Sequence, residues 1–209
     1  MFFYWKRALG STYILTFALF VGAIVAQQAI GIPWVLRLRS AEESGLPLSD
    51  LWIIILASVL LLVVDGITQG VIRGFYGSKF QETQNLFLDN VAVGNYNVVW
   101  IVGVTAAMEE LFFRGVIVQG MQHVGTGVIW AVIVGAFFSG LAHYFDDRPG
   151  YRWWALTNTS EGIFLAILQV LTGSILVVMI VHFIHDTLYG SVGIFLHRNL
   201  KASQGVTHN

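Results

Sequence analysis

The 209-residue sequence is 56% hydrophobic and only 11% charged, against roughly 25% charged residues in soluble globular domains. With a mean hydropathy of +0.72, this composition indicates a membrane protein and leaves room for one helix bundle. The net charge of −1, without basic runs, argues against a nucleic-acid partner, and the absence of cysteine excludes disulfides and thiolate chemistry.

Apolar runs long enough to cross about 30 Å of hydrocarbon as helices recur along the chain. They predict an all-α bundle of about six membrane helices, with spans near 11–34, 51–72, 99–122, 127–145, 161–173 and 174–197. The fifth span is short and is separated from the sixth only by Thr172-Gly173-Ser174. Segment 35–50 is predicted to be a loop, and segment 73–98 to lie partly along the membrane surface.

The positive charges predict the orientation of these spans. With the N-terminus inside, eight Lys and Arg residues fall on the cytoplasmic side and only Arg37 and Arg39 fall outside, which favours an N-in, C-in topology. The first apolar run follows Lys6 and Arg7 but is too long for a typical signal-peptide core, so we expect a retained anchor.

Three charges interrupt the third span: Glu109, Glu110 and Arg114. An ionisable residue at the centre of a membrane helix costs about 2.5–3.5 kcal/mol on insertion scales, so such residues usually mark a function. Glu110 and Arg114 are four residues apart and can pair on one helix face, either for catalysis or purely to fix packing. Glu109 points about 100° further round the helix and has no obvious local partner.

Two later spans also carry polar residues at membrane depth. His143 ends the fourth span, and His182 and Asp186 share one face of the sixth. Counted from the tight turns around 123–126 and 172–174, Glu109, His143 and Asp186 lie about 20–27 Å deep and His182 about 13 Å deep. We therefore expect these four residues to converge in the inner half of the bilayer.

Such a cluster can perform hydrolysis. A carboxylate within a bundle can act as a general base toward water, and a neighbouring histidine can orient that water or bind a metal. A His/Asp pair across the cavity can donate hydrogen bonds to a developing oxyanion. The constellation therefore indicates cleavage of an amide bond.

Some polar residues keep a structural interpretation as well. An interfacial role is the alternative for His143, which precedes Asp146 and Asp147. His185, three residues after His182, is either a second ligand or bonded to a backbone carbonyl. Asp65, with Gln69 one turn later, is a candidate polar contact to the core.

The residues resemble the CPBP intramembrane proteases, which include CAAX prenyl endopeptidases and bacteriocin-processing enzymes and are also called the Abi family. Glu109-Glu110-Leu-Phe-Phe-Arg114 is similar to the first family motif, Glu-Glu-x-x-x-Arg, and His182 with Asp186 to the third, His-x-x-x-Asn/Asp. The second motif, Phe-x-x-x-His, is imperfect, because Ser139 stands four residues before His143.

The resemblance implies an intramembrane endopeptidase that acts on membrane-associated peptides or protein C-terminal tails. The resemblance implies that Glu109 and His143 activate water and that His182 and Asp186 stabilise the oxyanion. It also implies that Glu110 and Arg114 hold the site together. The family has been described both as metalloproteases and as glutamate proteases, so a divalent metal such as zinc is a candidate cofactor, with Glu109, His143 and His182 as candidate ligands.

The same resemblance divides the chain into an N-terminal two-span region with an interfacial segment (1–90), a protease core (91–200) and a short cytoplasmic tail (201–209). The small size favours a prokaryotic cell membrane, with the active site toward the cytoplasm.

Other protease types fit the sequence poorly. It contains no His-Glu-x-x-His zinc motif, no Gly-x-Ser-Gly and no Gly-x-Gly-Asp. Two other functions remain open: a non-proteolytic immunity or scaffolding protein that uses the same cavity, and a proton- or ion-coupled transporter. Against transport stand the small size and the absence of inverted repeats.

Overall fold

The computed structural model describes residues 17–32, 34, 38–77, 99–144 and 151–203. All regular structure in these ranges is helical, so the all-α prediction is confirmed for the described part of the chain. The elements are a helix over Phe17–Ile30, α2 (Ala41–Ser44), α3 (Asp50–Tyr76), a helix over 99–110 that continues into the π-helix η1 (Leu111–Val118) and α5 (Gln119–His123), α6 (Val128–Tyr144), α7 (Tyr151–Thr172) and α8 (Ile175–Ser203).

Two tight turns lie where the sequence predicts them. Gly125 follows α5 with a φ of 85°, and Gly173 separates α7 from α8 with a φ of 61°. Glycine adopts this left-handed backbone without the steric cost of a Cβ. The Gly173 N–H donates to the Gln169 carbonyl at 2.7 Å, which ends α7, and Ser174 N–H donates to the Thr172 hydroxyl at 3.2 Å.

The fifth helix is longer than predicted. It begins at Tyr151, and polar residues in its first half lower the hydropathy enough to hide it from the sequence analysis. Their side chains bond back to their own helix: Thr159 Oγ1 donates to Ala155 O at 2.6 Å, and Asn158 Nδ2 donates to Trp154 O at 2.8 Å. A helix in an apolar environment tolerates such residues because their hydrogen bonds are satisfied internally.

The predicted loop 35–50 contains one short helix in its described part. Ser40 and Glu43 form a capping box at the start of α2, in which each side chain bonds the other residue's backbone N–H. Within the predicted interfacial segment 73–98, α3 continues to Tyr76, and residues 78–98 lie outside the described residues.

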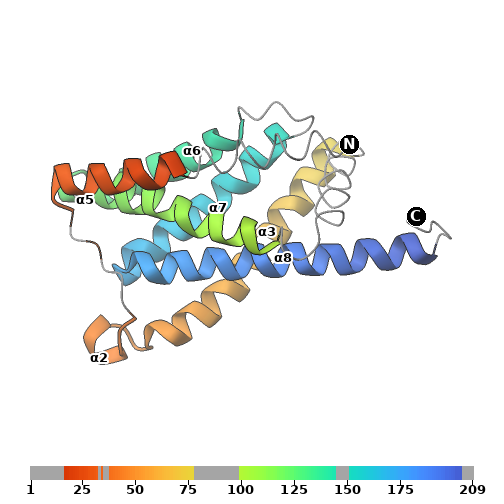
Figure 1. The fold of residues 1–209 in the computed structure, drawn as a ribbon, viewed down its shortest axis with the longest axis horizontal. Helices are drawn as coiled ribbons and strands as arrows, with labels where there is room; N and C mark the ends of the chain where they lie inside the picture. Colours follow the sequence, from red (N-terminus) through yellow and green to blue (C-terminus); the bar gives the residue numbers. More distant parts are fainter. Residues whose placement is uncertain (1–16, 33, 35–37, 78–98, 145–150, 204–209) are drawn as a thin grey trace.

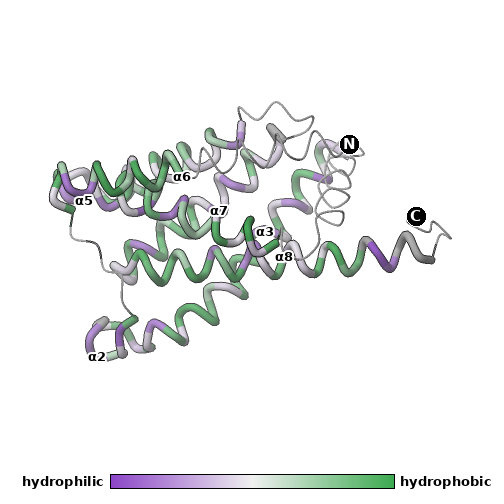
Figure 2. The backbone as a smooth tube through the Cα atoms, in the orientation of Figure 1, coloured by the Kyte–Doolittle hydropathy of each residue, from purple (hydrophilic) through white to green (hydrophobic). Residues whose placement is uncertain are grey.

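Among the residues that the structure describes, two helices are long and apolar enough to cross a membrane: Asp50–Tyr76, with a mean hydropathy of 2.5, and Ile175–Leu196, with a mean hydropathy of 1.6. Phe17–Ile30 and Val128–Tyr144 are shorter apolar helices. Hydrophobic residues dominate the long helices, which are interrupted by isolated hydrophilic positions (Figure 2). The six-span, N-in, C-in topology stays a prediction.

Consecutive long helices run in alternating directions, and the end of α8 projects beyond the others (Figure 1). As a result, α3 and α8 lie parallel, and Ile54, Ala57 and Leu61 pack against valines of α8 and leucines of α7. The helix over 99–110 runs antiparallel to α8: its first residue, Val99, lies against Gly190, and its last, Glu110, bonds His182. This packing brings α3, α7, α8 and the acidic motif to one region.

Candidate active site

The helix that carries the acidic motif changes from α to π geometry directly after it. Glu110 is the last α-helical residue, and in η1 the backbone bonds extend to five residues, with Gln119 N–H donating to Arg114 O. π-helical turns are rare and occur frequently at functional sites. Nothing in the residue pattern predicts this change.

Glu110 is fully buried and tied to two other residues. Its Oε1 accepts hydrogen bonds from Arg114 Nη1 at 3.0 Å and from His182 Nδ1 at 2.7 Å. Arg114 Nη2 also donates to the Gly162 carbonyl at 3.3 Å. The predicted Glu110–Arg114 pair is therefore present, and it joins this helix to α7 and α8.

Glu109 is half-buried and, unlike Glu110, is not held by hydrogen bonds from the described residues. From the residues described, its carboxylate receives no hydrogen bond and no ion pair, while it interacts electrostatically with His143, His182 and Asp186. The four groups expected to converge are thus brought to one place. His182 Nε2 lies 3.7 Å from Asp186 Oδ1, so the third motif is also assembled.

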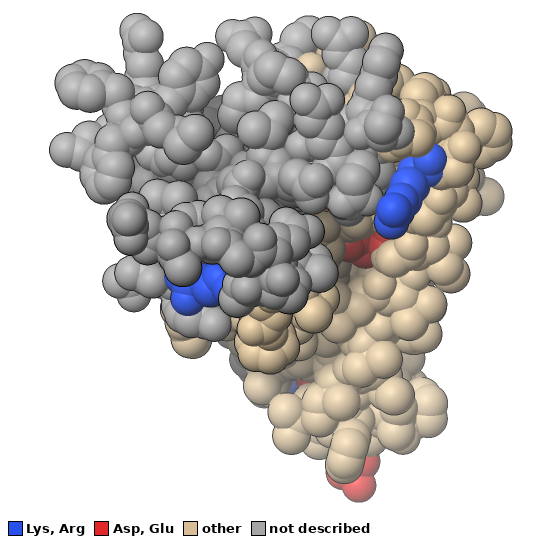
Figure 3. Space-filling view, turned by 90° about the vertical axis from the view of Figure 1, so that its right-hand side faces the viewer, with Lys and Arg blue, Asp and Glu red and all other residues tan. Residues whose placement is uncertain are grey.

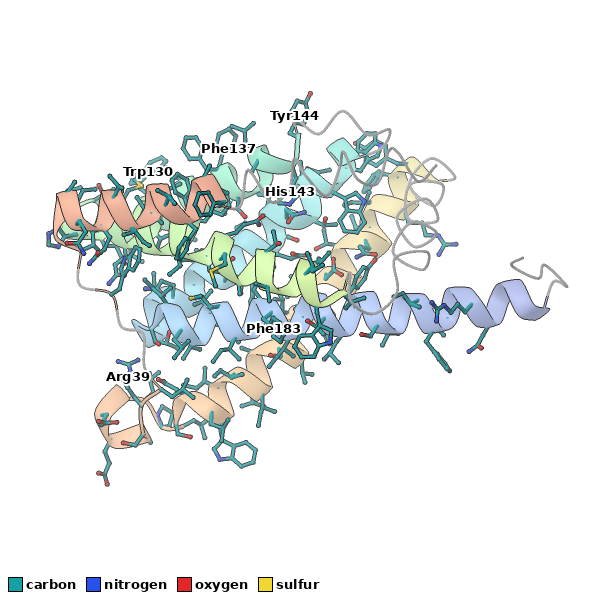
Figure 4. The ribbon with its side chains drawn as sticks, viewed as in Figure 1. Arg39, Trp130, Phe137, His143, Tyr144 and Phe183 are labelled. Atoms are coloured by element: carbon teal, nitrogen blue, oxygen red, sulfur yellow. The ribbon has the colours of Figure 1, made fainter. Side chains whose placement is uncertain are left out.

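His143 reaches the site from the end of α6. Its Nδ1 is 3.1 Å from the Ser139 carbonyl oxygen. A carbonyl only accepts, so Nδ1 carries the proton and Nε2 keeps a lone pair. Figure 4 shows His143 turned toward the bundle, whereas Tyr144 and Phe137 point away from it. This orientation favours the functional interpretation of His143 over the interfacial one.

The molecule is hollowed on the face that Figure 3 shows. In Figure 3 acidic atoms are visible within this hollow, next to a basic side chain. The ring centroids of Tyr76 and Trp153 lie 3.8 Å apart, which places the end of α3 beside the start of α7.

A family model for type II CAAX prenyl endopeptidases, Rce1-like, matches residues 91–188, which contain all three motifs. The match supports the resemblance of residues 91–188 to the CPBP intramembrane proteases. The match covers a little under half of the chain. No curated protein and no solved structure matches it.

The matched family model is one of CAAX-type membrane proteases, which act on peptide or protein substrates. The match does not favour the bacteriocin-processing (Abi) branch, and it does not decide between glutamate and metal dependence.

The departure from the CPBP pattern at Ser139 has a packing explanation. Ser139 is buried where α6 meets α7, and a Cβ added to Gly162 would lie 3.3 Å from Ser139 Cβ and 3.0 Å from Ala136 Cα. A phenylalanine ring has no space in this contact. The serine therefore fits the close approach of the two helices.

A second polar cluster adjoins the CPBP motifs. Donor atoms of Asp65, Glu161 and His185 lie within 4.8 Å of one another, and all three residues are buried. Gln69 Nε2 donates to Asp65 Oδ2 at 2.6 Å, which makes Asp65 the core polar contact that the sequence suggests. His185 Nδ1 pairs with Asp186 Oδ1 at 2.9 Å, so the expectation of a backbone carbonyl partner is wrong.

Glu161 is the residue that sequence reasoning missed. Its position at the start of the short fifth span made it resemble a span boundary, although a lone carboxylate followed by twenty uncharged residues is a signal. Among the described residues, this triad is the one group of three suited to a metal, and Glu109, His143 and His182 do not form another. We therefore derive no catalytic step through a metal.

Proposed function

We propose that this chain is an intramembrane endopeptidase in which Glu109 activates the attacking water. The observation that carries the proposal is the contrast between the two adjacent carboxylates. Glu110 is held by Arg114 and His182, whereas Glu109 has no such bonds in the described structure and interacts electrostatically with both motif histidines. A general base needs a lone pair that water can reach. Glu110 Oε2 also lacks a partner but belongs to a fully buried residue, whereas Glu109 is only half-buried.

In this mechanism Glu109 accepts a proton from water, and the hydroxide attacks the carbonyl of the scissile bond. His143 Nε2 accepts the second hydrogen bond of that water, because Nδ1 is committed to the Ser139 carbonyl. Glu109 then returns the proton to the leaving amine.

His182 and Asp186 serve the oxyanion. His182 Nδ1 donates to Glu110, so in its doubly protonated form His182 offers Nε2–H to the developing negative charge. Asp186 Oδ1 lies 3.7 Å from that nitrogen and orients the ring between turnovers. Glu110 and Arg114 are positioning residues, since they act by holding His182 and α7.

The proposal includes the six-span, N-in, C-in topology, with residues 1–90 as an N-terminal region and 91–200 as the protease core. The hollow in Figure 3 then opens to the cytoplasm, where a peptide or protein tail can enter.

The test uses the purified full-length protein with a matched pair of tail peptides, one prenylated and one not. Glu109→Gln and His143→Ala should each reduce cleavage by about 10²–10⁴-fold, the range for loss of general acid–base catalysis. His123→Ala, at the exposed last residue of α5, is the control and should keep full activity. Full cleavage by both site variants would show that the assignment is wrong.

A further inference from the structure

Three ionisable residues from three helices meet outside the proposed water-activating group. Asp65 lies on α3, Glu161 on α7 and His185 on α8, with relative exposures of 3%, 8% and 3%. Their donor atoms lie within 4.8 Å of one another. Burial of two carboxylates at one point is costly unless a cation compensates them.

The histidine of this cluster is oriented as a metal ligand. His185 Nδ1 bonds Asp186 Oδ1 at 2.9 Å, and since a carboxylate accepts, Nδ1 carries the proton. In the neutral ring Nε2 is then the nitrogen with the lone pair, and it is buried and has no hydrogen-bond partner. Metal-binding histidines almost always donate their other N–H in this way to a carboxylate or carbonyl.

The aspartate is held in a matching way. Asp65 Oδ2 accepts from Gln69 Nε2 at 2.6 Å, and Tyr189 in turn donates to Gln69 Oε1 at 3.3 Å. Asp65 Oδ1 is buried without a hydrogen-bond partner. The buried cluster thus contains two atoms without a hydrogen-bond partner, one from Asp65 and one from His185. The hydrogen bonds that hold these two side chains in place are already made.

The surrounding charges favour a cation as well. The described residues of this region include five carboxylates, from Asp65, Glu109, Glu110, Glu161 and Asp186, and one permanent cation, Arg114. Arg114 bonds Glu110, so a divalent cation beside Asp65 and Glu161 balances two carboxylates that accept no hydrogen bond from this guanidinium in the described structure.

We propose that Asp65, Glu161 and His185 bind one divalent first-row metal ion, Zn²⁺ by donor type. Two carboxylates and one imidazole suit zinc better than magnesium, which avoids nitrogen ligands. Tetrahedral zinc at 2.0–2.2 Å separates its donors by about 3.4 Å. His185 Nε2 and Asp65 Oδ2 are 3.8 Å apart, so this pair needs to approach by about 0.4 Å, and all three donors already lie within 4.8 Å of one another.

A metal at this place has a positioning role for the neighbouring site. It fixes His185, whose Nδ1–H holds Asp186, and Asp186 lies beside His182. The ion is separate from the catalytic water. A chelator can therefore reduce cleavage even though a glutamate, and not the metal, is the general base. The inference does not rest on proteolysis, because metal binding is measured directly.

The experiment measures zinc content of the purified full-length protein and Co²⁺ binding, by its visible absorption, after chelator treatment. We expect about one metal ion per chain. Glu161→Gln and His185→Ala should weaken binding by about 100-fold or more, because loss of an outer partner alone costs about 10–100-fold. His143→Ala is the matched histidine control and should keep the metal.

Two results would overturn the proposal. One is wild-type protein that binds neither Zn²⁺ nor Co²⁺, which would mean that protons neutralise the cluster. The other is loss of the metal in His143→Ala with retention in Glu161→Gln, which would place the ion at the catalytic histidines. Because the wild-type titration needs no variant, a misfolded variant does not leave the question open.

Discussion

Removal of the Arg114 guanidinium should destabilise the fold more than any surface charge does. Arg114 is 1% exposed and Glu110 is 0% exposed, and Arg114 donates to Glu110 Oε1 and to the Gly162 carbonyl. Arg114→Ala leaves a buried carboxylate with only His182 as its partner. Loss of one partner of a buried ion pair costs about 3–5 kcal/mol. At about 2–4 °C per kcal/mol for a chain of this size, Tm should fall by ~6–20 °C.

A double-mutant cycle separates the pair from its surroundings. Glu110→Gln should cost a similar amount, because it leaves the guanidinium without its counter-charge. Glu110→Gln with Arg114→Ala should cost clearly less than the sum, because no uncompensated charge remains. Arg73→Ala, an exposed arginine near the end of α3, is the control. Reversible unfolding in detergent and thermal unfolding give the four free energies.

The reasoning fails on either of two outcomes. In one, Arg114→Ala unfolds at the same temperature as Arg73→Ala, so that the buried pair contributes nothing. In the other, the single substitutions add without coupling, so that Glu110 and Arg114 act independently although their atoms are 3.0 Å apart.

Two further predictions concern the contact between α6 and α7. Ser139→Phe, which restores the family residue, should lower stability by about 1–3 kcal/mol through overpacking against Gly162, seen as a lower unfolding midpoint; unchanged stability would contradict the packing explanation. Gly140→Ala should cost a similar ~1–3 kcal/mol, because its Cβ would lie 2.7 Å from the Ala155 carbonyl. Gly70→Ala, with open space around it, should instead stabilise by about 0.4–1 kcal/mol, and equal effects at both glycines would refute the contact.

Local spacing predicts much of the site. The four-residue separation of Glu110 and Arg114 correctly gives their ion pair, and depth counting from the two turns correctly brings Glu109, His143 and Asp186 together. Both rules work because a helix converts sequence separation into distance and angle along a nearly rigid rod. The sequence did not predict the start of α7, because hydropathy does not record polar side chains that form hydrogen bonds with their own helix.

Contacts between helices could not be predicted in the same way. The bond from His182 to Glu110 and the meeting of Asp65, Glu161 and His185 depend on the rotation of four helices about their axes. Rotation is set by packing of small residues at close contacts, and no single helix carries that information. The sequence therefore predicts which residues lie at the same depth, and the packing decides which of them touch.

The π-helix η1 also affects how Leu111–Val118 should be aligned with the sequences of related proteins. A π-turn holds more residues than an α-turn, so the faces presented after Val118 are rotated with respect to the acidic motif. Gly120, which lies against Ile32, owes its direction to that rotation. Relatives with a regular α-helix here should be one residue shorter between the arginine and the following turn. A gap at this place in an alignment would then be a structural signal, not an error.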